Sequence, residues 1–157
     1  MRRVQAHGEA MRDGKAKSRS KYEPGGYDFR VKRSSAGLGL FAGEEIPSGK
    51  CVIEYVGRTL SEDEIYTTKS KYLFEVTKRK TIDGKPKWGN PAGYINHSCT
   101  PNCEAVVRGG RIFIFSLRSI EEGKELSYDY GENYCLDHCT PCLCPAEKHL
   151  YKKPVKA

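Results

Sequence analysis

The sequence reads GYINHSCTPNC at residues 93–103 and ELSYDYG at residues 125–131, and these two stretches carry most of the information about its fold. The first begins its nine residues 95–103 with the apolar Ile95 and then packs together Asn96, His97, Ser98, Cys99, Asn102 and Cys103. Asn and His side chains so close together can hold a polar ligand. From the residue types alone, a ligand site and an ordinary loop with a satisfied histidine are both open.

The second stretch places Tyr128 and Tyr130 two residues apart. On a strand this spacing puts both rings on one face, because side chains alternate with a period of two. Tyr72 and Phe74 repeat the spacing elsewhere in the chain. Converging phenols can line a narrow channel, although a single Y-x-Y is more often plain aromatic packing.

Short strands and turns dominate the rest of the chain, which has 16 Gly and 8 Pro. Alternating or apolar runs predict strands at residues 27–33, 37–42, 51–58, 72–76, 80–83, 103–108 and 111–118. Gly109 and Gly110 predict a hairpin turn between the last two strands. We therefore expect a mostly β domain with little helix.

One helix is predicted, at residues 61–71, because Ser61 and Glu64 have the spacing of a capping box. After Tyr130 the chain is rich in turn residues and cysteine. Strands and helices do not alternate, which excludes a doubly wound nucleotide-binding fold. The G-L-G at residues 37–39 is then no dinucleotide fingerprint, since it lacks the third Gly and the long helix.

Basic residues are concentrated at the two ends of the 157-residue chain, whose net charge is +7. Residues 1–33 carry ten Lys or Arg against four Asp or Glu, and residues 148–157 add four Lys. Such tails permit weak, nonspecific contact with nucleic acid, although a solvated tail has the same composition. We expect a basic flexible N-terminal arm at residues 1–26, one main domain at residues 27–131, and a cysteine-rich flap with a basic tail at residues 132–157.

The sequence gives no sign of a membrane or secretory segment. Its apolar runs fall short of the roughly 20 residues that a membrane helix needs. The first residues, MRRVQAHGEAMRDGKAK, lack the apolar core of a secretory signal. We therefore expect a soluble intracellular protein that does not bind membranes and is a monomer.

Seven cysteines are distributed unevenly along the chain. Cys51 stands in an apolar run and is expected in the core. Four others crowd into ten residues: Cys135, Cys139, Cys142 and Cys144. Without a secretory signal, such a cluster favours a bound metal over disulfides.

An ordered set of motifs resembles the SET-domain family of protein-lysine methyltransferases. The set runs GLGLFA, EYVG, YLF, GYINHSCTPNC, ELSYDYG and a terminal C-L-C, and it covers about residues 27–150. The resemblance implies a compact fold of the β-clip type, in which the INHSC segment threads under a neighbouring loop to form a pseudoknot. That threading is an exception to the usual avoidance of threaded chains.

The resemblance implies S-adenosylmethionine as cofactor. The backbone of the G-L-G would contact its methionine end, where missing Cβ atoms allow a close approach. Side chains and backbone of the INHSC region would hold the rest. The implied cofactor-binding residues are Gly37, Leu38, Gly39, Tyr94, Asn96, His97 and Tyr130.

The implied reaction is methyl transfer to the ε-amine of lysine in a histone-like or other basic protein. Tyr130 would be the catalytic tyrosine, Tyr72 and Phe74 would line the lysine channel, and Tyr128 would set how many methyl groups are added. An aromatic channel favours the neutral amine by desolvation. No strong general base is then needed, which fits a site rich in Tyr and poor in carboxylates, and we expect mono- or dimethylation.

The chain end resembles the family's post-SET motif, C-x-C-x-x-x-x-C, with His149 at the position of the last Cys. The implied Zn²⁺ ligands are Cys99, Cys142, Cys144 and His149, a Cys₃His set that zinc accepts. Cys139 or Cys135 as the fourth ligand, and a flap without metal, are open alternatives.

Two departures from the family pattern leave other functions open. The chain has Gly93 and Tyr94 where the family often has Arg-Phe, and the flap motif is unusual. One alternative is a binding protein that keeps the fold without turnover. Another is a basic zinc module that contacts nucleic acid through its tails, although the sequence has no base-reading motif.

Overall fold

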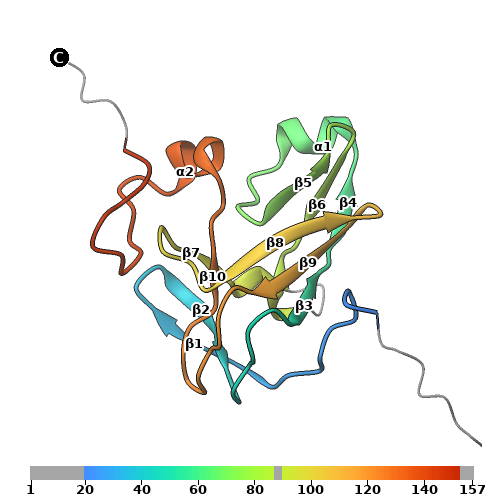
Figure 1. Cartoon of the computed structure of the whole chain (residues 1–157). Helices are drawn as coiled ribbons and strands as arrows, with labels where there is room; N and C mark the ends of the chain where they lie inside the picture. Colours follow the sequence, from blue (N-terminus) through green and yellow to red (C-terminus); the bar gives the residue numbers. More distant parts are fainter. Residues whose placement is uncertain (1–19, 87–89, 153–157) are drawn as a thin grey trace, which may run out of the picture.

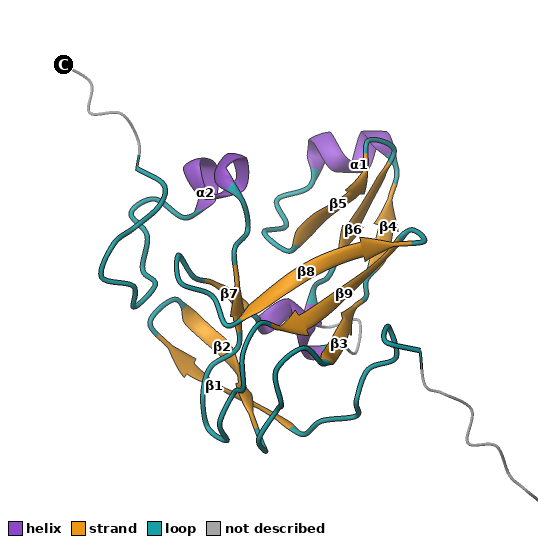
Figure 2. Cartoon of the chain, viewed as in Figure 1, coloured by secondary structure: helices purple, strands orange, loops and turns teal. Residues whose placement is uncertain are grey.

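Short strands in four small sheets surround one apolar core in the computed structural model, which describes residues 20–86 and 90–152 (Figure 1). Most of the predicted N-terminal arm and the end of the basic tail lie outside the described residues. The expectation of a mostly β fold is confirmed, since strands and loops make up most of the described chain (Figure 2).

Three of the sheets are antiparallel. The first pairs β1 (Phe29–Ser34) with β2 (Gly37–Ala42). The second has the order β3 (Cys51–Tyr55), β9 (Arg111–Ser116) and β8 (Cys103–Arg108). The third has the order β4 (Arg58–Leu60), β6 (Lys80–Asp83) and β5 (Leu73–Thr77).

The fourth sheet pairs the two stretches that the sequence singles out. Strands β7 (Asn96–His97) and β10 (Ser127–Tyr128) run parallel, with Asn96 opposite Ser127 and His97 opposite Tyr128. These two short parallel strands bring the INHSC and ELSYDYG segments side by side.

The turns follow the local sequence closely. Gly109 and Gly110 have φ of 57° and 70°, and the left-handed conformation at both positions is what a tight hairpin turn between β8 and β9 requires. The predicted strand at residues 51–58 is in fact two strands, β3 and β4. Val56 and Gly57 separate the two strands, and a Cβ atom at Gly57 would lie only 2.2 Å from the carbonyl oxygen of Asp83.

The predicted capping box is confirmed at helix α1 (Glu62–Thr67), where Ser61 and Glu64 hold each other's backbone N–H. The helix is shorter than the predicted 61–71, because Thr68 has extended backbone angles. The sequence predicts a segment rich in turn residues after Tyr130, and the structure adds a helix there that was not predicted. Helix α2 (Glu132–His138) begins there, after Gly131, and the short 3-10 helix η2 (Pro91–Tyr94) precedes β7.

The core lies between the sheets and consists of aliphatic side chains from several elements. Each fully buried Leu or Ile contributes about 1.5–3 kcal/mol to folding. Cys51 is buried, as predicted. The aliphatic side chains exposed by 2% or less are Leu40, Ile46, Val52, Ile95, Ile112, Ile114, Ile120 and Leu126.

Residues 20–26, which the sequence assigns to the flexible arm, contact the domain. The ring of Tyr22 lies 5.4 Å from that of Phe113 and 5.6 Å from that of Phe115, and Arg108 stacks on it. Within the part of the chain that the structure describes, no helix combines the length and apolar character needed to cross a membrane.

Candidate active site

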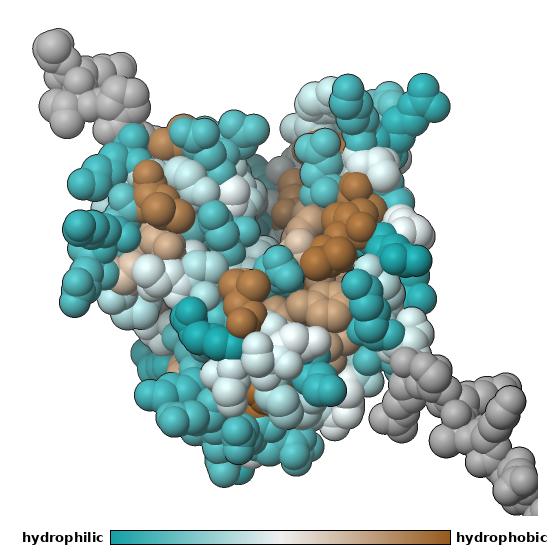
Figure 3. Space-filling view, viewed as in Figure 1, coloured by the Kyte–Doolittle hydropathy of each residue, from teal (hydrophilic) through white to brown (hydrophobic). Residues whose placement is uncertain are grey.

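Two cavities meet at Tyr130. One is an aromatic cavity of about 490 Å³ between β5, the end of β10 and α2, and the other is a cleft of about 470 Å³ between the G-L-G strand, η2 and the flap. Tyr72 and Tyr130 line both cavities. The space-filling view shows the surface hollowed between the part that carries α2 and the part that carries α1 and β5 (Figure 3). A ligand in one cavity can therefore approach a ligand in the other beside Tyr130.

The aromatic cavity brings together the rings that the sequence predicts for a lysine channel. The ring centroids of Tyr128 and Tyr130 are 4.8 Å apart, and those of Phe74 and Tyr128 are 6.2 Å apart. Burial raises the pKa of the Tyr128 and Tyr130 phenols, so both hydroxyls stay protonated and neutral at physiological pH. The cavity wall is thus apolar, with hydroxyl groups that can donate hydrogen bonds.

Hydrogen bonds fix Tyr130 at its side-chain hydroxyl and at its backbone N–H. Its hydroxyl donates to the carbonyl oxygen of Ile95 at 2.5 Å, and its backbone N–H donates to Nδ1 of His97 at 3.2 Å. Both partners belong to the INHSC segment. The two sequence stretches therefore fix the position of one phenol at the junction of the cavities.

Two residues of this cavity were missed by the sequence analysis. Tyr55, in EYVG, donates its hydroxyl to the carbonyl oxygen of Tyr72 at 2.9 Å and stacks on Phe74. Tyr134, on α2, packs edge-on against Tyr130 at 5.3 Å and donates its hydroxyl to the carbonyl oxygen of Lys71. Burial raises the pKa of Tyr134 to about 12. The EYVG motif could have pointed to Tyr55, whereas Tyr134 lies on the helix that was not predicted.

The second cavity is lined by most of the residues predicted for the cofactor: Gly37, Leu38, Tyr94, Asn96, His97 and Tyr130. Gly37 has a φ of 111°, which favours glycine, and a Cβ atom there would meet nothing within 4 Å. This uncovered backbone at the wall of the cleft leaves room for a ligand to approach closely. Gly39 is the exception, since it is buried and does not line the cleft.

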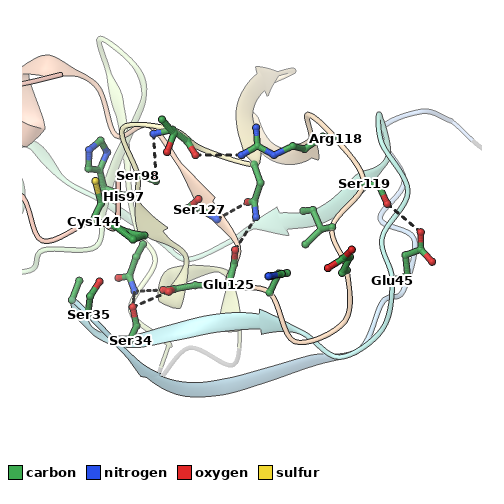
Figure 4. Close-up of a pocket in the computed structure, with 18 residues that line it drawn as sticks. Ser34, Ser35, Glu45, His97, Ser98, Arg118, Ser119, Glu125, Ser127 and Cys144 are labelled. Atoms are coloured by element: carbon green, nitrogen blue, oxygen red, sulfur yellow. Dashed lines mark hydrogen bonds between the residues drawn. The ribbon is translucent and has the colours of Figure 1, made fainter. Parts of the chain in front are cut away.

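Gly39 instead makes room for Glu125, the first residue of ELSYDYG. A Cβ atom at Gly39 would lie 2.3 Å from Oε1 of Glu125. That carboxylate accepts from the Ser34 hydroxyl at 2.9 Å and from Nδ2 of Asn96 at 2.8 Å, and Nδ2 also donates to the carbonyl oxygen of Leu38 at 3.0 Å. Figure 4 shows Ser34 and Glu125 facing each other beside a neighbouring polar cavity. These hydrogen bonds fix the position of the G-L-G strand relative to Asn96.

We expect Gly39→Ala to weaken cofactor binding by about 10- to 100-fold, because the new methyl group displaces Glu125 and breaks hydrogen bonds to a charged group, each contributing about 1.5–3 kcal/mol. Calorimetric titration with S-adenosylmethionine measures the effect. Glu125→Ala should have a similar effect, and Gly39→Ala added to it should cost little more, because the two share one mechanism. Additive losses would contradict this role of Gly39.

A cluster of thiols and imidazoles lies where the flap meets the INHSC segment. The Cys99 sulfur is 3.9 Å from the Cys142 sulfur and 3.9 Å from Nδ1 of His149, and the Cys144 sulfur is 3.5 Å from the same nitrogen. Burial opposes ionisation of Cys144, but N–H groups of Cys99 and Ala146 donate to its sulfur and hold its pKa at about 6. The structure therefore brings together all four residues that the sequence predicts as zinc ligands.

Three further residues with possible metal-ligand atoms lie beside this cluster: His97, Asp129 and Cys135. Nε2 of His97 is 3.3 Å from the Cys99 sulfur, and Nδ1 of the same ring is 3.5 Å from the Cys135 sulfur and 3.6 Å from Asp129. Two groups of side chains therefore lie close enough together to hold a metal ion, one of His97 with Cys99, Cys142 and Cys144, and one of His97 with Asp129 and Cys135. Burial lowers the pKa of His97, which keeps the imidazole neutral at physiological pH.

Comparison with known proteins agrees with this geometry. The family model described as SET domain matches residues 37–131, which include the G-L-G strand, both cavities' main walls and both sequence stretches. The chain belongs to the SET domain family.

Curated relatives of this SET domain carry the names of histone-lysine methyltransferases. Histone-lysine N-methyltransferase 2D of Homo sapiens is 39% identical over 124 residues, covering 70% of this chain and 2% of the relative. Histone-lysine N-methyltransferase ASHH3 of Arabidopsis thaliana is 38% identical, covering 80% of this chain and 39% of the relative. The probable histone-lysine N-methyltransferase set-23 of Caenorhabditis elegans is 35% identical, covering 82% and 60%. The chain thus spans at most about three fifths of these relatives.

The SET domain has a structural reason for Gly93, where the resemblance suggests Arg. A Cβ atom at Gly93 would lie 2.2 Å from the carbonyl oxygen of Gly84 and 3.2 Å from Cδ of Pro86. The segment after β6 therefore occupies the space beside the backbone of η2. A larger residue at position 93 would require that segment to move.

Carboxylates surround the mouth of the aromatic cavity, so the expectation of a carboxylate-poor site is wrong. Glu75, Asp129, Glu132 and Asp137 line it together with one exposed lysine, Lys71. All four acids are exposed. They give the mouth a negative charge within a basic protein, which attracts cations.

Proposed function

We propose that this SET domain transfers a methyl group from S-adenosylmethionine to the ε-amine of lysine in a protein. The observation that carries the proposal is the position of Tyr130, which lines both the aromatic cavity and the cleft beside the G-L-G strand. A lysine side chain entering the first cavity would end beside the second. Proximity and alignment of the two ligands supply most of the acceleration in such a transfer.

The residues of the aromatic cavity favour the neutral form of the substrate amine, and none of them has to act as a strong general base. Stacked rings of Phe74, Tyr128 and Tyr130 exclude water and disfavour the ammonium form, which lowers the pKa of the amine. At the inner end of the aromatic cavity, the Tyr130 hydroxyl donates a hydrogen bond to the carbonyl oxygen of Ile95. They orient the amine there. When bound, S-adenosylmethionine supplies a methyl group on a positively charged sulfur.

The substrate class follows from the charge around the channel. Asp129, Glu132 and Asp137 at its mouth favour a lysine flanked by basic residues, because unlike charges attract at short range. The names of the relatives, which are histone-lysine methyltransferases, support a histone-like tail. A nuclear location would follow if histones are the substrate.

We also propose that Cys99, Cys142, Cys144 and His149 bind one structural Zn²⁺. A tetrahedral ion with the usual bond lengths separates two sulfurs by about 3.8 Å and a sulfur from a nitrogen by about 3.5 Å. The separations of 3.9, 3.9 and 3.5 Å in the cluster fit these values. The ion would tie the flap, with Leu143 at the cleft wall, to the INHSC segment.

We expect the wild-type protein to stop at mono- or dimethyl-lysine and Tyr128→Phe to add more methyl groups. Tyr128 is 6% exposed and packed between Phe74 and Tyr130, so its hydroxyl takes space that a methylated amine would need. Mass spectrometry of the product lysine measures the methylation state. Mainly trimethyl-lysine from the wild type would contradict this reading of Tyr128.

The activity itself is tested by incubating the protein with radiolabelled S-adenosylmethionine, core histones and, in parallel, a whole-cell extract. We expect labelled protein bands with the wild type. No label in any sample, from a protein that binds the cofactor by calorimetry, would favour a SET-fold binding protein without turnover.

A further inference from the structure

The imidazole of His97 lies between Tyr130 and the thiol cluster. Its Nδ1 accepts the backbone N–H of Tyr130 at 3.2 Å, and its Nε2 lies 3.3 Å from the sulfur of Cys99. The residue is 9% exposed, and its ring contacts the Tyr130 ring with a centroid distance of 5.5 Å. One buried ring thus touches both the candidate active site and the candidate metal site.

The hydrogen bond from Tyr130 determines which ring nitrogen carries the proton. A backbone N–H can only donate, so Nδ1 of His97 must present its lone pair. In a neutral imidazole the proton then sits on Nε2. Nε2–H points at the Cys99 sulfur and donates to it.

This proton position decides between the two histidines at the cluster. With hydrogen on Nε2 and Tyr130 on Nδ1, His97 has no free lone pair for a metal, although it lies within ligand distance of Cys99, Cys142 and Cys144. The same occupation of Nδ1 argues against a second ion between His97, Asp129 and Cys135, where Oδ1 of Asp129 also accepts the N–H of Gly131 at 2.9 Å. His149 is left as the imidazole ligand.

Cys99 has the surroundings of a metal-bound thiolate. Its sulfur receives the backbone N–H of Leu150 at 3.3 Å as well as Nε2–H of His97. Hydrogen bonds to ligand atoms stabilise their charge and orient them, and removing such a partner typically weakens metal binding by about 10- to 100-fold.

We propose that His97 is a positioning residue that couples the metal site to the active site, by donating to the Cys99 thiolate while it holds the backbone of Tyr130. The inference rests on the zinc site proposed above. Metal binding fixes Cys99, Cys99 orients the His97 ring, and the ring fixes Tyr130. The position of Tyr130, beside which cofactor and lysine would bind, then depends on the metal.

Two substitutions of His97 each remove one of its two hydrogen bonds and keep the other. The amide oxygen of an asparagine occupies the place of Nδ1, so His97→Asn keeps an acceptor for Tyr130 and loses the donor to Cys99. The amide nitrogen of a glutamine reaches the place of Nε2, so His97→Gln keeps the donor and loses the acceptor. His149→Ala removes the proposed ligand. Each protein is purified whole and loaded with Co²⁺ or Zn²⁺, and thermal unfolding confirms that it folds.

The measurements are the Co²⁺ absorption spectrum, Zn²⁺ affinity in chelator competition, and cofactor affinity. We expect His97→Asn to keep the tetrahedral ligand-field bands while Zn²⁺ affinity falls about 10- to 100-fold. His97→Gln should bind Zn²⁺ nearly as the wild type does but bind cofactor more weakly. His149→Ala should lose the Cys₃His spectrum.

Each contrary outcome identifies what has failed. Equal Zn²⁺ affinity of His97→Asn and the wild type would overturn the coupling alone. Loss of the Cys₃His spectrum in His97→Asn but not in His149→Ala would make His97 a ligand and also overturn it. A wild-type protein that binds no metal would overturn the zinc site and the coupling together. Methyl transfer by that protein would show that the proposed activity stands without them.

Discussion

Tyr130→Phe should lower the rate of methyl transfer by about 100-fold or more while leaving cofactor affinity nearly unchanged. The change removes only the hydroxyl, which donates to the carbonyl oxygen of Ile95 at 2.5 Å where the two cavities meet. The ring keeps its contacts with Tyr128 and Tyr134, so the cleft keeps its shape. A displacement of about 1 Å at the reacting centre can cost about 100-fold. Steady-state rates with labelled cofactor measure the effect.

Tyr66→Phe is the matched control for this substitution. Tyr66 lies on α1 and is 88% exposed, so loss of its hydroxyl should leave the rate unchanged. If Tyr130→Phe were as active as Tyr66→Phe, the hydroxyl at the junction would have no part in the reaction. If Tyr130→Phe bound no cofactor, the Tyr130 hydroxyl would contribute to cofactor binding rather than to methyl transfer.

Removal of Cys142, a proposed zinc ligand, should have the second large effect. We expect Cys142→Ser to lose the bound ion and, with it, most cofactor affinity, because residues of α2 and of the flap up to Cys144 form one wall of the cleft. Structural zinc ions contribute directly to folding free energy. Zinc content by elemental analysis and cofactor titration measure the two losses, and a chelator should reproduce both in the wild type.

Cys139→Ser distinguishes the proposed ligand set from the alternative fourth ligands. Cys139 caps the end of α2 and lies near the thiol cluster, as does Cys135. We expect this variant to retain one zinc per chain. A loss of zinc equal to that of Cys142→Ser would show that Cys139, and not His149, completes the tetrahedron.

Local patterns in the sequence predicted the elements that depend on local interactions. Ser61 and Glu64 define the start of α1 because a capping box involves only four consecutive residues. The hairpin at Gly109 and Gly110 follows for the same reason. Helix α2 escaped prediction, because Gly131 offers no capping side chain and Cys135 is the helix's one buried residue.

The candidate site was predictable through motif order and not through residue types. Tyr128, Tyr130, Phe74 and Tyr72 lie where the resemblance implies, although a Y-x-Y pattern alone indicates ordinary packing. The partnership of Gly39 with Glu125 depends on strand pairing between distant segments, which no local pattern reveals. The same holds for the approach of Gly84 to Gly93 and for the carboxylates that α2 brings to the channel mouth.

The proposed reaction transfers a methyl group from a cofactor held in the cleft to a protein lysine in the adjoining aromatic cavity. Its most direct test uses S-adenosylmethionine with a deuterated methyl group and a histone-tail peptide, followed by fragmentation mass spectrometry of the peptide. We expect a deuterated methyl group on a lysine ε-nitrogen with the wild-type protein and its near absence with Tyr130→Phe. Transfer to another residue type, or equal transfer by both proteins, would contradict it.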